Sequence, residues 1–295
     1  MPVNHLFKKI LRVPGSKTKR SLGKRLTRFP LTKTRPITLS DFHPAPAGWC
    51  IGEPHFIGIG TVKAGTSWWY SMLLDHPQIV ENRIRQKELR YFVHFGLSGL
   101  KAHDRDIYRR AFAAPPGSLC GEWSPVYLSH PLCIEYIAET APAARIMIIL
   151  RNPIDRVASF LNEATYGTSG FNFSPEQQYV FDLFNVFPRA LYSGLYARDL
   201  KRLLHFFNRK QILVLQYEKC RIDPLAEISR TYAFLGIDER HQPKTIHRAV
   251  NRKDYVIPEI SPEGRCRLID YFTEDVHLTM EMFPELDQSL WDDFM

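Results

Sequence analysis

The sequence predicts an α/β fold built on a parallel β-sheet, and two observations support this prediction. The expected strands are short, uninterrupted apolar runs, which are typical of strands buried on both faces. These runs alternate along the chain with longer segments whose apolar residues recur at helical spacing. The chain has 295 residues, of which 44% are hydrophobic, so it can form one large domain of this class or two small ones.

The expected elements can be placed in chain order. Strands are predicted at 55–59, 145–150 and 211–215. A helix over about 65–74 follows the first strand and ends before Asp75-His76-Pro77, because proline cannot continue a helix. A second helix begins after Asn152-Pro153, beyond the second strand. Helical spacing predicts further helices at 131–140, about 195–207, 224–235 and 263–283.

The basic charge of the chain is concentrated at its start. The formal net charge is +8, yet residues 1–40 contain eleven Lys or Arg and no Asp or Glu, which leaves 28 basic and 31 acidic residues in the remainder. A nucleic-acid-binding domain normally spreads its basic residues over a folded face, so nucleic acid is an unlikely partner. We therefore expect a basic N-terminal extension over residues 1–50 and a folded domain over 51–295.

Within the extension, Leu6, Phe7, Ile10 and Leu11 would share one face of a helix. This pattern predicts attachment to an anionic membrane surface, with an organelle-targeting peptide and a plain solubilising tail as alternatives. The longest apolar run, about 144–150, is far below the ~20 residues that a membrane-spanning helix needs, and no secretory signal is expected. Five cysteines without a CxxC pair favour a reducing, cytoplasmic location, with no disulfide framework and no metal site.

The turn after the first strand has the composition of an anion-binding loop. It runs from Gly58 to Trp68 and joins a strand to a helix N-terminus, so several backbone N–H groups can point at one phosphate or sulfate. The dinucleotide fingerprint GxGxxG fails, because Lys63 stands where the third glycine belongs. The Walker pattern GxxxxGK[ST] nearly fits from Gly60, but Thr66 replaces its lysine. The cation lies three residues earlier, at Lys63.

Lys63-Ala-Gly-Thr-Ser67 after an apolar strand, followed by His76-Pro77, resembles the 5′-phosphosulfate-binding loop of sulfotransferases. These enzymes use 3′-phosphoadenosine 5′-phosphosulfate (PAPS) as donor, and the heparan-sulfate and bacterial carbohydrate types are the most similar. The resemblance implies a P-loop NTPase-like three-layer sandwich with a central parallel sheet. It also implies donor-binding roles for Lys63, Ala64, Gly65, Thr66, Ser67 and Trp68.

A second segment supports the resemblance. Arg151-Asn-Pro-Ile-Asp-Arg-Val-Ala-Ser159 is similar to the family's 3′-phosphate-binding motif, in which an arginine leaves a strand and a serine follows eight residues later. Arginine can donate a bidentate pair of hydrogen bonds to a phosphate. Arg252 and Lys253 belong to a later basic segment, which is either a solvated loop or a loop that closes over the 3′-phosphate.

The catalytic base is assigned through a third segment. Lys87-Glu88-Leu-Arg-Tyr-Phe92 looks like the family's Lys-Glu-x-His-Phe-Phe segment, whose glutamate serves as general base in some members. Arg90 departs from the usual histidine, and Trp123, in the segment Gly121–Tyr127, departs from a lysine that some relatives use near the leaving group. His94 and His103 are alternative bases. Trp68 and Trp123 are expected in the core, with contact of one of them to adenine or the acceptor as the alternative.

These observations predict a PAPS-dependent sulfotransferase in which Lys63 and Glu88 are the catalytic residues and no metal is required. The acceptor would offer a hydroxyl or an amine, as in a carbohydrate, a glycolipid or another small hydroxylated molecule. Two alternatives remain. One is a P-loop kinase-like phosphotransferase, and the other is a nucleotide-binding module without turnover. The sequence gives no indication of oligomeric state.

Overall fold

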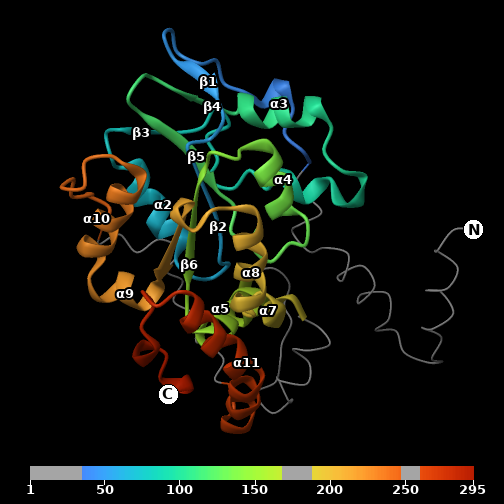
Figure 1. The fold of residues 1–295 in the computed structure, drawn as a ribbon, viewed down its shortest axis with the longest axis vertical. Coiled ribbons are helices and arrows are strands. Elements are labelled where there is room, and N and C mark those ends of the chain that lie inside the picture. The colour runs from blue at the N-terminus through green and yellow to red at the C-terminus, as the bar shows by residue number, and fades with distance from the viewer. Residues whose placement is uncertain (1–34, 168–187, 247–259) are drawn as a thin grey trace, which may run out of the picture. The chain divides into compact units, whose positions relative to one another are not determined.

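The computed structural model describes residues 35–167, 188–246 and 260–295 (Figure 1). Its central sheet has five strands in the order β3-β5-β2-β6-β7, and every neighbouring pair is parallel. Helices cover both faces of this sheet (Figure 1). The predicted α/β three-layer sandwich is therefore confirmed. The basic residues 1–34, with their predicted helix, and Arg252 and Lys253 lie outside the described residues.

The three predicted strands are confirmed to within one residue. They are β2 (Phe56–Gly60), β6 (Arg145–Leu150) and β7 (Ile212–Gln216). Two further strands, β3 (Ile79–Val80) and β5 (Leu119–Trp123), extend the sheet beyond β2. Because neighbouring strands are parallel, their carboxyl ends share one edge, which is where open α/β sheets bind their ligands.

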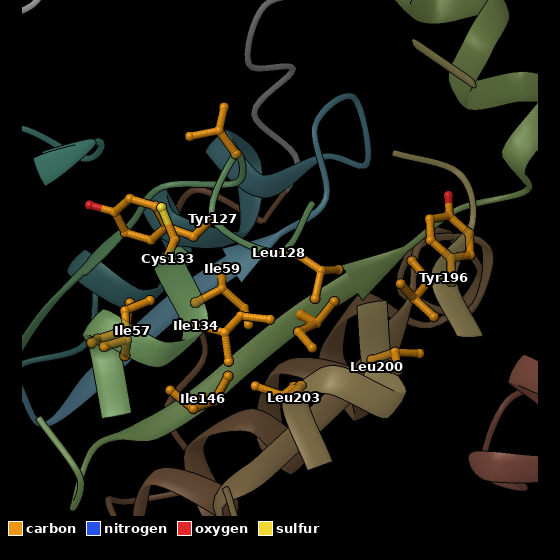
Figure 2. Close-up of a cluster of buried hydrophobic side chains, with 14 of the residues drawn as sticks. Ile57, Ile59, Tyr127, Leu128, Cys133, Ile134, Ile146, Tyr196, Leu200 and Leu203 are labelled. Carbon is orange, nitrogen blue, oxygen red and sulfur yellow. The ribbon is translucent and has the colours of Figure 1, made fainter. Parts of the chain in front are cut away.

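Two apolar cores lie on opposite faces of the sheet, because successive side chains of a strand alternate between faces. On one face, Ile57 and Ile59 of β2 and Ile146 of β6 point toward Ile134 and Leu203 (Figure 2). On the other face, strand residues such as Phe56, Met147 and Leu213 pack against tryptophans and tyrosines of two helices. The uninterrupted apolar runs in the sequence thus reflect burial on both faces.

The helices divide between these two cores. α4 (Cys133–Thr140), α5 (Pro153–Gly167), α8 (Tyr196–Phe206) and α11 (Pro262–Met282) pack in the first core, and α2 (Thr66–Leu74) and α10 (Pro224–Leu235) pack in the second (Figure 1). All six had been predicted. The short helices α3 (Ala102–Arg110), α7 (Pro188–Tyr192) and α9 (Tyr217–Ile222) and the antiparallel pair β1 (Cys50–Gly52) and β4 (Phe112–Ala114) had not.

Pro36–Met295 forms one compact unit, which includes the segment before β1. Ile37 is buried in the first core, and the His43 N–H donates to the Arg83 carbonyl (2.8 Å). All five cysteines are free thiols. Across the described ranges, every helix is too short or too polar to cross a bilayer.

Candidate active site

The anion-binding loop connects β2 to α2 and contains two residues in the left-handed region of backbone space. Lys63 has φ 69° and Gly65 has φ 78°. A Cβ added to Gly65 would lie 2.8 Å from the Tyr217 ring, so glycine is needed here for space as well as for conformation. A non-glycine residue with positive φ costs free energy and is found most often at functional sites. The loop therefore holds Lys63 in a defined, strained position beside the N-terminus of α2.

Lys87 is a second cation at this loop, and the sequence had shown it only as the first residue of the segment that carries Glu88. Its ammonium donates to Thr66 Oγ1 (2.9 Å) and Ser67 Oγ (3.0 Å), the first two side chains of α2. It also contacts Glu88 Oε1 at 3.3 Å. Burial lowers the pKa of Lys87, and the Glu88 carboxylate acts in the opposite direction. Lys87 thus joins the anion-binding loop to the predicted general base.

Arg151 follows β6 and reaches the same loop. Its Nη1 donates to the Lys63 carbonyl (3.3 Å), and its guanidinium lies over the Tyr217 ring at 4.9 Å. The Tyr196 hydroxyl donates to the Arg151 carbonyl (2.7 Å) and fixes the backbone at this point. Within the described part of the chain, the buried Arg151 Nε has no hydrogen-bond partner. An orphaned, buried N–H of a cation beside an anion-binding loop fits an absent phosphate ligand.

The start of α5 is held by Glu218 of α9, which also contacts Trp291 near the end of the chain. Glu218 accepts the Asn152 N–H on one carboxylate oxygen and the Trp291 indole N–H on the other, both at 2.9 Å. Burial raises the pKa of Glu218, and these two hydrogen bonds oppose the rise. Ser159, the second member of the predicted 3′-phosphate motif, is half-buried on α5. The structure thus places Arg151 at the loop and Ser159 further along the helix that Arg151 precedes.

Glu88 lies between two cations. Arg90 Nε donates to Glu88 Oε2 at 2.8 Å, while Lys87 contacts the other carboxylate oxygen. Arg90, which replaces the family's usual histidine, therefore pairs directly with the predicted base. Of the alternative bases, His103 is exposed on α3 and contacts Asp104 at 3.1 Å. His94 is half-buried, and burial lowers its pKa.

The two candidate aromatic contacts differ in their exposure. Trp123 is fully buried, and its indole N–H donates to the Gly60 carbonyl (3.1 Å). Trp123 is therefore a core residue beneath the loop, as expected, and its burial does not fit the alternative of a contact to adenine or the acceptor. Trp68 is 9% exposed and donates to the Ile246 carbonyl (3.1 Å), so it holds the segment that leads to residues 247–259. Ala64 is fully buried inside the loop.

The structure thus brings Arg151 to the loop of Lys63 and Gly65, and Lys87 links Thr66 and Ser67 of the same loop to Glu88. The site is a strand-to-helix turn at the carboxyl edge of the sheet, with four cations (Lys63, Lys87, Arg90 and Arg151) and the Glu88 carboxylate. This arrangement can bind a phosphate or sulfate ester and place a base beside it. Among the described residues, no group of three His, Cys, Asp or Glu side chains could hold a metal ion.

Comparison with known proteins agrees with this geometry. Residues 53–253 match the model of the sulfotransferase domain family. A heparan sulfate N-deacetylase/N-sulfotransferase 4 of Mus musculus is 27% identical over 208 residues, 64% of this chain. The membrane-associated sulfotransferase kil1 of Dictyostelium discoideum is 30% identical over 106 residues, 36% of this chain. The matched segments span only 23% and 22% of these two relatives.

Among solved structures, a sulfotransferase from Alicyclobacillus acidocaldarius has the same fold. It superimposes with a TM-score of 0.64 at 24% sequence identity, over 82% of this chain and 100% of that one. The resemblance noted in the sequence is therefore confirmed at the level of family and fold.

Proposed function

The chain belongs to the sulfotransferase domain family, and we propose that it transfers a sulfuryl group from PAPS to a hydroxyl or amine of a carbohydrate-like acceptor. The observation that carries this proposal is the position of Lys87. Its ammonium contacts the Thr66 and Ser67 hydroxyls at 2.9 and 3.0 Å and the Glu88 carboxylate at 3.3 Å. An anion on the loop would therefore lie next to a base that can activate an acceptor.

The proposed reaction is an in-line displacement at sulfur. The acceptor oxygen or nitrogen forms a bond to sulfur while its proton passes to Glu88. The bond between sulfur and the bridging oxygen breaks, and its electron pair stays on the 5′-phosphate of the departing 3′,5′-bisphosphate. Lys63, Lys87 and the N–H groups at the start of α2 stabilise the charge that develops on that phosphate. Charge is thus neutralised by side chains and backbone dipoles.

We assign the 3′-phosphate of the donor to Arg151 and Ser159, with Arg252 and Lys253 as further contacts from outside the described residues. Removing a charged hydrogen bond costs about 1.5–3 kcal/mol, which corresponds to roughly 10–150-fold in affinity. We expect Arg151→Ala to lose most of the preference for 3′-phosphoadenosine 5′-phosphate over adenosine 5′-phosphate in calorimetry. Arg240→Ala, whose side chain is 89% exposed, is the control. Equal affinity of the unmodified protein for both nucleotides would overturn the assignment.

The names of the relatives support a carbohydrate as the proposed acceptor class. The names of the Mus musculus relative and of others like it refer to heparan sulfate, so a carbohydrate is the first class to test, with glycolipids and other small hydroxylated molecules next. A mass-spectrometric screen with PAPS as donor would identify the product. Magnesium-dependent ATP binding would favour the kinase-like alternative instead. Binding of the bisphosphate without transfer to any acceptor class would favour an inactive module.

A further inference from the structure

A second carboxylate, Glu122, lies directly behind the segment that carries Glu88. It stands near the end of β5 and is fully buried. Its Oε1 accepts the hydroxyls of Tyr108 (2.8 Å) and Tyr127 (3.0 Å), and its Oε2 accepts the Ser124 hydroxyl (2.6 Å) and the Leu89 N–H (3.0 Å). A buried carboxylate is costly unless it is hydrogen-bonded, and this one has four donors.

The end of β5 and the turn after it fasten the base segment at four backbone groups. The Trp123 N–H donates to the Lys87 carbonyl (2.8 Å), and Glu122 accepts the Leu89 N–H. The Ser124 hydroxyl accepts the Arg90 N–H (2.9 Å), and the Tyr127 hydroxyl accepts the Tyr91 N–H (2.7 Å). Glu122 organises this set, because the hydroxyls of Ser124 and Tyr127 both donate to its carboxylate.

The base segment needs such support because its backbone is irregular. Arg90 has φ 47°, a left-handed conformation that disfavours a residue with a side chain. The side chains that contact Glu88, those of Lys87 and Arg90, belong to this same segment, so its backbone is held only by contacts from β5 and the turn after it among those described above. A carboxylate held in place by neighbouring hydrogen bonds keeps its geometry better than one on an unsupported turn.

We propose that Glu122 is a positioning residue, which holds the backbone of residues 87–91 so that Glu88 stays against Lys87 and the anion-binding loop. This inference rests on the proposed function, since it concerns the base of that reaction. Glu122 itself touches neither donor nor acceptor in this assignment. Its effect is exerted through the Leu89 amide and through the hydroxyls that it orients.

The test compares Glu122→Ala with Glu122→Gln in the full chain. Alanine removes the acceptor of the Leu89 N–H, whereas glutamine keeps one oxygen that can accept it. We expect Glu122→Ala to lower kcat at least tenfold while the Kd for 3′-phosphoadenosine 5′-phosphate stays within about twofold. Glu122→Gln should recover kcat to within a few-fold of the unmodified protein. Asp275→Ala is the matched control, because the Asp275 carboxylate also accepts a backbone N–H, that of Ala197 (2.9 Å), between α11 and α8.

Hydrogen exchange of the peptide covering residues 87–92 gives a readout that does not depend on activity. Exchange should accelerate in Glu122→Ala, remain slow in Glu122→Gln and be unchanged in Asp275→Ala. If Glu122→Ala does not fold, Ser124→Ala can replace it, because it removes the acceptor of the Arg90 N–H. This variant should show a smaller loss of kcat and a smaller acceleration of exchange, again with unchanged bisphosphate affinity. Equal losses in the alanine and glutamine variants, or a parallel loss of bisphosphate affinity, would overturn the proposal. If the unmodified protein transfers no sulfuryl group while the exchange pattern appears, the proposed function fails and the backbone support by Glu122 stands.

Discussion

The donor side and the base side of the candidate site are built by different means. The donor side is built mainly from backbone. A turn with two left-handed residues leads into the N-terminus of α2, and its Lys63 carbonyl accepts a hydrogen bond from Arg151. On the base side, Glu88 stands on a segment that is fixed by side chains buried behind it. Lys87 belongs to both sides.

This difference affects how each side responds to substitution. A backbone-built loop depends on a few local residues that share one stretch of sequence, such as Gly65. A segment held by side chains depends on residues more than thirty positions away, such as Glu122 and Tyr127. Substitutions on the donor side should therefore change binding first, and substitutions on the base side should change turnover first.

Among the substitutions that test this difference between the two sides, Glu88→Gln should cause the largest loss of turnover. Removing a general base typically costs ~10²–10⁴-fold in rate, whereas donor affinity should stay near normal because Glu88 acts on the acceptor. Steady-state kinetics combined with calorimetry of the bisphosphate measures both quantities. Glu139→Gln, at an exposed ion pair with Arg105, is the control. A Glu88→Gln enzyme with more than about half of its activity would assign the proton to another group.

Lys87→Met should impair both turnover and donor binding, because Lys87 contacts the donor loop and the base. Methionine has a similar length but lacks the ammonium that contacts Thr66, Ser67 and Glu88. Loss of charged hydrogen bonds of this kind costs about 1.5–3 kcal/mol, so we expect roughly 10–150-fold in kcat/KM, together with weaker bisphosphate binding. Lys101→Met, at an exposed position, serves as control. A change confined to turnover or to binding would place Lys87 on one side only.

Glu122 makes stability depend on pH. Burial raises its pKa from the ordinary 4.5 to about 7, against the opposing effect of its hydrogen bonds. The folded protein therefore holds a proton that the unfolded chain releases, so this contribution is complete below pH 4.5 and is lost as pH rises to about 7. The loss is on the order of 3 kcal/mol, or roughly 6–12 °C in Tm for a domain of this size.

Thermal unfolding of the unmodified protein and of Glu122→Gln, compared across this pH range, measures the contribution. Glutamine cannot titrate, so the difference in Tm between the two proteins should shift in favour of the glutamine variant as pH rises. Histidines that titrate in the same range affect both proteins equally. A pH-independent difference would mean that Glu122 keeps the same charge throughout.

The smallest effect on chemistry is expected from the basic extension. We propose that it attaches the protein to an anionic surface, at ~1 kcal/mol for each basic residue near the bilayer, and one relative is named as membrane-associated. Full-length protein and a chain that starts at Arg35 should differ in sedimentation with anionic liposomes at low salt and not at high salt. The cut must precede Ile37, which is buried in the core. Equal sedimentation would remove the membrane proposal, and both proteins should bind the bisphosphate alike.

Local patterns in the sequence predicted the strands in which nearly every residue is apolar and buried. β2, β6 and β7 are uninterrupted apolar runs and were predicted to within one residue. β5 was missed because Gly121 and Glu122 interrupt its apolar character. In our proposal Glu122 supports the base segment. The same polar residue therefore explains both why β5 was not predicted and what that strand contributes to the site.

For the site as well, the sequence predicted the residues that belong to short local motifs. The loop and Arg151 belong to short motifs, and the structure brings them together. Lys87 was seen only beside Glu88, because its other partners, Thr66 and Ser67, lie about twenty residues earlier in the chain. A contact between residues this far apart in the sequence leaves no pattern in either segment from which it could be predicted. For Trp123 the core expectation is confirmed, and the alternative of a ligand contact does not fit, since a position next to a motif does not determine the face to which a side chain points.

Trp123 also constrains how this chain can diverge from its relatives. A Cβ added to Gly58 would lie only 2.0 Å from the Trp123 ring, so the indole fills space that a side chain at 58 would need. The two positions are therefore coupled, and their substitutions should not be additive. A side chain at position 58 can be accepted only after the indole at 123 has been replaced by a smaller residue, and that first replacement leaves a cavity. The order in which these two positions can be changed in this chain is therefore restricted.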